Sequence, residues 1–94
     1  MDLDLRKLRY FVAVAQCSSF RRAAAVLHVA QPALTRQIRA LEGQLNAELF
    51  TRSFRGAELT DAGRQLFEDA QPLLAAADSI RLRLTRAPQA DIVG

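Results

Sequence analysis

Apolar side chains recur every three or four positions along three stretches of the chain, which is the spacing of one buried helix face. These stretches cover about 5–16, 20–27 and 32–45. Their apolar positions are Leu5, Leu8, Phe11, Val12 and Ala15, then Phe20, Ala23, Ala24 and Leu27, then Leu34, Ile38, Leu41 and Leu45. The pattern predicts three helices, and a short turn at 28–30 joins the second helix to the third.

The residues that precede these stretches predict how each helix begins. Asp4 and Ser19 are favourable N-cap residues for the first and second helices. Pro32 suits the first turn of the third helix, where its missing N–H has no intrahelical partner, and this places Gln31 at the N-cap. Neither Gln31 nor Ala30 caps well, so we expect free N–H groups there that attract an anion such as a phosphate.

A small hairpin is predicted after the third helix. Two short runs, 49–52 and 57–59, flank a tight link at 54–56. Two short helices, a tight turn, a third helix and a hairpin form a winged helix-turn-helix, so the expected fold is mainly α. In that fold the third helix, about 32–45, lies in the DNA major groove, and the wing at 54–56 contacts the minor groove or the backbone.

A long helix is predicted after the hairpin. Thr60 is its N-cap, and we expect it to extend to about residue 86, until Pro88 stops it. Its apolar residues alternate in steps of four and three, the heptad spacing by which two helices pair. They are Leu66, Ala70, Leu73, Ala77, Ile80 and Leu84. The pattern predicts a dimerisation helix, and Pro72 within it predicts a kink or a bend.

The outer face of the third helix carries candidate DNA contacts. If Leu34 is set at zero and each residue advances about 100°, Arg36 and Arg39 lie opposite the apolar stripe. Arg36 suits a phosphate or a guanine edge, and Thr35 suits a base edge, a phosphate or a thymine methyl. The full set of predicted contacts is Gln31, Pro32, Ala33, Thr35, Arg36, Arg39, Arg52 and Arg55.

Three of these arginines have alternative interpretations. Arg39 is either a DNA contact or a solvated surface residue. Arg52 either contacts DNA or pairs with Glu48 or Glu58 and holds the hairpin in place. Arg55 at the tip of the wing contacts either the minor groove or the backbone.

The distribution of charge favours a polyanionic partner. Residues 1–60 hold nine basic and five acidic side chains, whereas residues 61–94 hold four basic and five acidic ones. The net charge of +3 and the isoelectric point near 10.0 therefore arise from the first part of the chain.

Other classes of function find little support. The chain has a single cysteine, Cys17, and a single histidine, His28, so we expect no internal disulfide, no metal site and no cofactor. We find no catalytic arrangement of nucleophile, base and acid and no glycine-rich phosphate loop, so an enzyme is not expected. No apolar run approaches the ~20 residues of a membrane span, and the acidic start does not resemble a signal peptide, so a cytoplasmic location is expected.

The stretch "SFRRAAAVLHVAQPALTRQIRALEGQLNAELFTRSFRGAELTDAGRQL", residues 19–66, closely resembles the DNA-binding region of LysR-type transcriptional regulators. The most specific parts are "AA..LH", "QPALTRQI.ALE..L...LF.R" and "LT.AG", and the similarity covers roughly residues 3–86. The sequence departs from the family at Ala30, where many members have Ser, and at Pro72.

This resemblance implies DNA contacts at Gln31, Pro32, Thr35, Arg36 and Arg55. It also implies a homodimer formed through the linker helix, bound to an interrupted palindrome, and a tetramer when a C-terminal effector domain is present. That domain binds the small-molecule inducer in such regulators, so we expect no inducer site within these residues and expect the chain to be a DNA-binding fragment.

The expected organisation is a DNA-binding domain at 1–59, a linker helix at 60–87 and the start of a hinge at 88–94. A winged helix that serves only protein interaction and assembly is the alternative. A protein-binding face should expose more leucine or aromatic residues than the arginine-bearing outer face of the third helix does.

Overall fold

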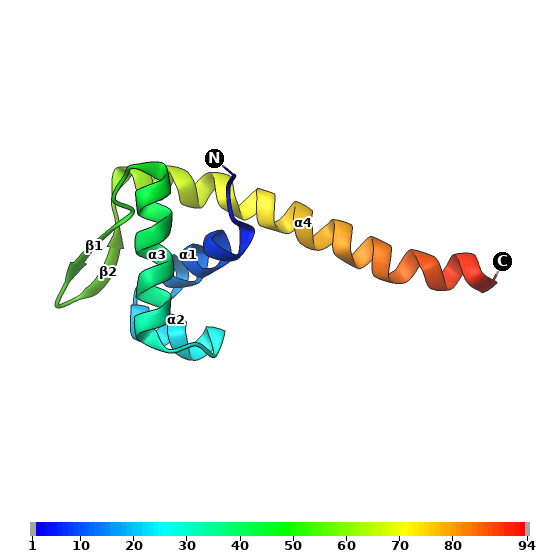
Figure 1. Cartoon of the computed structure of the whole chain (residues 1–94), viewed down its shortest axis with the longest axis horizontal. Helices are drawn as coiled ribbons and strands as arrows, with labels where there is room; N and C mark the ends of the chain where they lie inside the picture. The colour runs from blue at the N-terminus through cyan, green and yellow to red at the C-terminus, as the bar shows by residue number, and fades with distance from the viewer. Residues whose placement is uncertain (1, 94) are drawn as a thin grey trace.

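The computed structural model describes the backbone of residues 2–93 and the side chains of residues 2–86. Within these residues it contains four helices and one hairpin. In chain order they are α1 (Leu5–Cys17), α2 (Phe20–Leu27), α3 (Gln31–Leu45), β1 (Phe50–Ser53), β2 (Gly56–Leu59) and α4 (Asp61–Val93). Helices α1 to α3 and the hairpin form a body at one end, from which α4 extends as a long arm (Figure 1). The predicted winged helix-turn-helix with a long C-terminal helix is confirmed.

The two predicted N-caps are present in the structure. The Asp4 carboxylate accepts hydrogen bonds from the backbone N–H groups of Arg6 (2.8 Å) and Lys7 (3.4 Å). The Ser19 hydroxyl accepts one from the N–H of Arg22 at 3.1 Å. The Lys7 ammonium group donates to Asp4 as well, and this bond, with the backbone bonds, lowers the pKa of the Asp4 carboxyl.

The start of α3 differs from the prediction by one residue. Ala30, not Gln31, is the N-cap, because the Ala30 carbonyl already accepts the first helical bond from the Leu34 N–H (3.1 Å). Pro32 therefore occupies the second helical position, where it still needs no hydrogen-bond partner. The expected lack of a side-chain cap is confirmed.

The core lies where α1, α2 and α3 meet. Its buried side chains include Leu8, Phe11, Val14, Phe20, Ala23, Ala24, Leu34, Ile38, Leu41, Leu49 and Phe50. In α1 the predicted stripe was wrong at Leu5, which is 41% exposed, and it omitted Val14, which is fully buried; Val12 and Ala15 are partly buried against the core. The buried face follows Leu8, Phe11 and Val14 at three-residue steps, and Leu5 at the first helical position lies at its margin.

The hairpin is anchored to the end of α1. Its strands are antiparallel and pair Phe50 with Leu59 and Ser53 with Gly56, so only two residues form the turn. The Ala57 N–H donates to the Ser18 carbonyl at 3.1 Å. Gly56 has a φ of +118°, and a Cβ atom there would collide with the same Ser18 carbonyl oxygen. A glycine at this position allows the wing to approach α1 this closely.

Helix α4 begins at the predicted cap. The Thr60 hydroxyl accepts from the Gly63 N–H (2.9 Å) and donates to the Glu48 carbonyl (2.6 Å), which ties the helix start to the loop that follows α3. Farther along, Asp78 of α4 pairs with Arg9 of α1 at 3.0 Å. This contact and the buried Leu74 hold the first half of α4 against the body.

The expected end of α4 at Pro88 was wrong, because the helix extends past it to Val93. The helix assignment is also continuous through Pro72, and the expected kink or bend there stays a prediction. Pro72 and Glu68, whose carbonyl loses its usual donor, are both exposed, so water can satisfy that carbonyl. Pro88 likewise removes one backbone hydrogen bond from a helix of 33 residues.

Candidate nucleic-acid interface

The two faces of α3 are sharply different. Leu34, Ile38 and Leu41 are at most 2% exposed and fix the helix on the core. The opposite face is accessible: the exposed residues are Gln31, Pro32, Arg36 and Arg39, and Ala33 and Thr35 are half-buried beside them. The structure therefore brings all six predicted residues of this helix onto one outer surface.

The exposed start of α3 adds partial positive charge to this surface. No side chain caps the helix at Ala30, and Ala30, Gln31 and Pro32 are all exposed. Unpaired N–H groups and the helix dipole both favour an anion at such a position. The arrangement suits a DNA phosphate near the N-terminus of α3.

Arg52 connects the hairpin to α3. Its Nη2 atom donates a hydrogen bond to the Thr35 Oγ1 atom at 3.3 Å. Its guanidinium group lies over the Phe20 ring, 3.9 Å from the ring centroid. Among the ion pairs of the described residues none joins Arg52 to Glu48 or Glu58, so that predicted pairing was wrong. From strand β1 the Arg52 side chain extends toward α2 instead, where its guanidinium group stacks on the Phe20 ring.

Phe20 supports an arginine of the candidate interface, although its helical spacing predicted only a core residue. Its ring packs edge-on against Phe50, with centroids 5.6 Å apart, and Phe50 packs against Phe11 at 5.3 Å. Phe20 is 7% exposed, and its ring supports the Arg52 guanidinium at the surface. Helical spacing identifies the buried face of α2 but cannot show which strand residue covers its edge.

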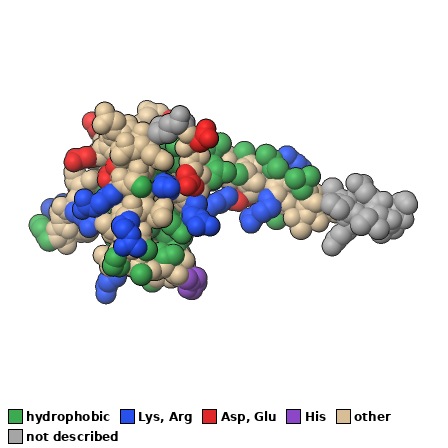
Figure 2. Space-filling model, in the orientation of Figure 1, with side chains coloured by type: hydrophobic (Ala, Val, Ile, Leu, Met, Phe, Trp, Pro, Cys, Tyr) green, Lys and Arg blue, Asp and Glu red, His purple; other side chains and the backbone are tan. Residues whose placement is uncertain are grey.

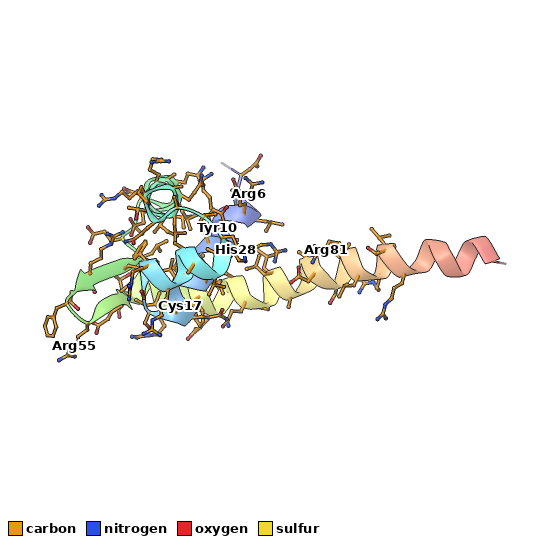
Figure 3. All side chains as sticks on the ribbon, turned by 90° about the horizontal axis from the view of Figure 1, so that it is seen from below. Arg6, Tyr10, Cys17, His28, Arg55 and Arg81 are labelled. Carbon is orange, nitrogen blue, oxygen red and sulfur yellow. The ribbon has the colours of Figure 1, made fainter. Side chains whose placement is uncertain are left out.

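The tip of the wing combines a cation with an uncovered aromatic ring. Arg55 lies at the free end of the hairpin, away from the body (Figure 3). Phe54 beside it is 97% exposed, and the Arg55 guanidinium carbon lies 5.8 Å from the Phe54 ring centroid. Phe54 was missed as a candidate contact, although an aromatic residue in a two-residue turn has no core within its reach.

Basic side chains gather over α3 and the hairpin on the face shown in Figure 2. Arg36, Arg39, Arg52 and Arg55 are all exposed. Within the part of the chain that the structure describes, none of these four arginines forms an ion pair. Their charges are therefore available to an anionic ligand, which suits a DNA backbone.

The predicted heptad seam on α4 is divided between two environments. Ala70 is 1% exposed and Leu66 packs partly against the same core, so the first part of the seam is covered by the chain's own body. This corrects the assignment of Ala70 to a dimer contact. Leu73, Ile80 and Leu84 are 43%, 50% and 65% exposed along the arm.

The described residues contain no group of three or more His, Cys, Asp or Glu side chains that could hold a metal ion. Across residues 2–93, the helices lack either the length or the apolar character that crossing a bilayer requires. His28 has a φ of +59° and ends α2, which agrees with its predicted role as a turn residue.

Comparisons with known proteins identify the same domain. The model of the family described as "Bacterial regulatory helix-turn-helix protein, lysR family" matches residues 5–64. The transcriptional regulator TfdT of Cupriavidus pinatubonensis is 52% identical over 73 residues, which are 78% of this chain and 32% of that protein. The regulator ClcR of Pseudomonas putida is 46% identical over 90 residues, 96% of this chain and 31% of that protein. The chain thus spans about a third of the length of these relatives.

Two solved structures of protein–DNA complexes have the same fold. The DNA-binding domain of BenM on catB site 1 DNA superposes with a TM-score of 0.87 at 40% identity, covering 92% of this chain and 97% of that one. The DNA-binding domain of CbnR on DNA gives 0.83 at 44% identity and covers 92% and 99%. The relatives are transcriptional regulators rather than enzymes. The chain belongs to the LysR family of bacterial transcriptional regulators and contains the winged helix-turn-helix by which that family binds DNA.

Proposed function

We propose that this domain reads an interrupted palindromic operator as a homodimer, with α3 in the major groove and the wing on the adjacent minor groove or backbone. The observation that carries the proposal is the outer face of α3, where exposed Arg36 and half-buried Thr35 stand opposite the buried Leu34 and Ile38. A helix held rigidly from behind presents its front side chains in fixed directions, which base recognition requires.

The residues of the interface divide into those that read bases and those that hold the backbone. Arg36, Thr35 and Gln31 face the base edges, and Pro32 and Ala33 offer apolar contact to thymine methyl groups. Arg39, farther along α3, grips a phosphate. Arg55 holds the backbone or the minor groove from the wing, a contact that fixes position rather than sequence.

The dimer forms through α4. The exposed Leu73, Ile80 and Leu84 lie on one side of a helix that extends beyond its own body, so a second copy of α4 is the natural cover for them. Each palindromic half-site then meets one α3, since the symmetry of the operator mirrors the symmetry of the dimer.

We assign residues 1–59 to DNA binding, 60–87 to dimerisation through α4 and 88–94 to the connection toward a further domain, although α4 itself continues to Val93. The matched segment makes up about a third of each of these relatives. In a full-length protein we expect a tetramer, a cytoplasmic location and an inducer-binding effector domain separate from the DNA-binding domain and α4.

Selection of bound duplexes from a random pool tests the proposal directly. The expected result is one interrupted palindrome with identical half-sites. Binding without sequence preference, and with little dependence on salt, would contradict it and favour the protein-interaction module. That alternative has little support from α3, because none of its described side chains is a highly exposed large apolar residue.

A further inference from the structure

We propose that Arg52 is a positioning residue that makes Thr35 a hydrogen-bond donor to the DNA. Thr35 then recognises an acceptor atom and discriminates against an amino group at the same place. This inference rests on the proposed function, because it assigns a polarity to one contact of the DNA-reading face. It concerns the chemistry of recognition, which neither the fold nor the family membership specifies.

The polarity follows from what each group can do. An arginine guanidinium only donates hydrogen bonds, so in the 3.3 Å contact between Arg52 Nη2 and Thr35 Oγ1 the threonine oxygen accepts. A hydroxyl also has one hydrogen to donate, and the positive guanidinium repels that hydrogen. The Thr35 O–H is therefore directed away from Arg52.

The Thr35 hydrogen has no acceptor among the described residues. A threonine within a helix usually donates to the carbonyl four residues earlier, as Thr85 does to Arg81 at 2.7 Å. Thr35 makes no such bond to Gln31 in the described part of the chain, and its side-chain partner there is Arg52. Its donor remains free on the outer surface of α3.

The Arg52 side chain is held in place by contacts with core residues. Its guanidinium rests 3.9 Å above Phe20, which packs on Phe50, and Phe50 packs on Phe11. Strand β1 fixes its backbone next to the same cluster. A guanidinium that is stacked and tethered in this way is preorganised, so it orients Thr35 before DNA arrives.

The Thr35 donor should therefore prefer a base that presents an acceptor atom to it. Guanine N7 and O6, adenine N7 and thymine O4 are acceptors in the major groove, whereas cytosine N4 and adenine N6 carry amino hydrogens. At each of these acceptors Thr35 contacts an electron-rich base atom, and the nearby positive charge of Arg52 strengthens that contact.

A double-mutant cycle on the selected operator tests the coupling. Thr35→Val keeps the shape and removes the hydroxyl, and Arg52→Lys keeps the charge and removes the planar stack. We expect each change to reduce discrimination at the same base pair by roughly 5- to 150-fold. The double variant should lose no more than Thr35→Val alone, and Thr35→Ser should retain most of the preference.

Arg81→Lys is the matched control. Arg81 is exposed on α4, pairs with Asp78 at 3.4 Å and lies far along the arm from Arg55 (Figure 3), so the same chemical change should leave the base preferences unaltered. Circular dichroism must show that every variant is folded. Additive effects of Thr35→Val and Arg52→Lys, or loss at different base pairs, would overturn the inference.

Modified operators identify the acceptor. If the atom is a purine N7, then 7-deazapurine at the coupled base pair should match the loss caused by Thr35→Val. If methylphosphonate at one linkage matches that loss instead, Thr35 donates to a phosphate, which carries no base identity, and the proposed base preference is wrong. A preference for an amino group at the coupled position also contradicts the inference. A parent domain that selects no operator would contradict the proposed function itself and this inference with it.

Discussion

Gly56 shows how one residue determines the position of the wing. Its φ of +118° lies in a region that L side chains rarely adopt, and the Ser18 carbonyl occupies the space where a Cβ atom would go. We expect Gly56→Ala to lower the free energy of unfolding by about 1–3 kcal/mol, because both strain and collision oppose it. Denaturant unfolding measures this change.

Gly43 provides the control for that substitution. It lies within α3, and a Cβ atom there would meet nothing within 4 Å. Gly43→Ala should therefore stabilise the domain by about 0.5–1 kcal/mol through helix propensity. If both substitutions changed stability in the same direction, the explanation based on the Ser18 contact would be wrong.

Substitutions of Arg36 and of Arg55 should impair DNA binding in different ways. Arg36→Lys keeps the charge but loses the planar fork, so it should relax the preference at a particular base pair by about 1–3 kcal/mol. Arg55→Ala should weaken specific and non-specific binding alike and lower the slope of log affinity against log salt by roughly 0.9 per subunit. Titrations at several salt concentrations, on operator and on unrelated DNA, measure both effects. Identical behaviour of the two variants would contradict the division of roles.

At the level of elements, local signals predicted the helices and the hairpin well. Asp4, Ser19 and Thr60 cap the helices as expected, because a cap depends on residues close in sequence. The start of α3 was misplaced by one residue, since Gln31 and Ala30 give no strong signal. Pro88 was expected to end α4, but the helix continues past it to Val93.

What the sequence could not predict depends on contacts between elements. The exposed outer face of α3 follows from periodicity, and all six of its predicted residues lie there. The stacking of Arg52 on Phe20 and the burial of Ala70 require the packing of the hairpin and of α4 against the body. Periodicity gives the face of a helix but does not name the element that covers it.

The wing offers a second test at this scale. Phe54 is almost fully exposed, and the chain contains no tryptophan, so Phe54→Trp introduces a single fluorescent probe at the wing tip. We expect its emission to change when operator DNA is added, because the ring leaves water for the surface of the duplex. Phe54→Ala should weaken binding without changing the salt slope, since no charge is lost.

Leu82→Trp serves as the reference probe. Leu82 is 55% exposed on α4, and its neighbour Arg81 lies far along the arm from Arg55 (Figure 3). Emission from a tryptophan at 82 should remain unchanged on operator binding. If the emission of the Phe54→Trp variant did not change under saturating DNA, the wing tip would be excluded from the interface.

At the scale of the whole molecule, the arm and the body have separate tasks. The body carries nine of the thirteen basic side chains and the proposed DNA-reading face of α3, whereas α4 carries the exposed apolar stripe. The molecule measures 57 Å along its longest axis but 27 Å and 19 Å along the others, and the second half of α4 extends beyond its own body (Figure 1). An uncovered apolar stripe on such an arm favours pairing with a second copy.

Two substitutions on the arm test this pairing. Leu73 and Ile80 lie on the same side of α4, so the double variant Leu73→Asp, Ile80→Asp should place charges within the proposed helix pair and yield a monomer. Leu82 lies about 180° around the helix from Leu73, so Leu82→Asp should leave the dimer intact. Analytical ultracentrifugation across micromolar concentrations measures the mass of each, and circular dichroism checks folding. A parent domain that is monomeric at high micromolar concentration, or a double variant that stays dimeric, would show that α4 does not join the two copies. If dimerisation does align two DNA-reading faces on one operator, the monomeric variant should also bind a single half-site as tightly as the parent does and lose its advantage on the complete palindrome.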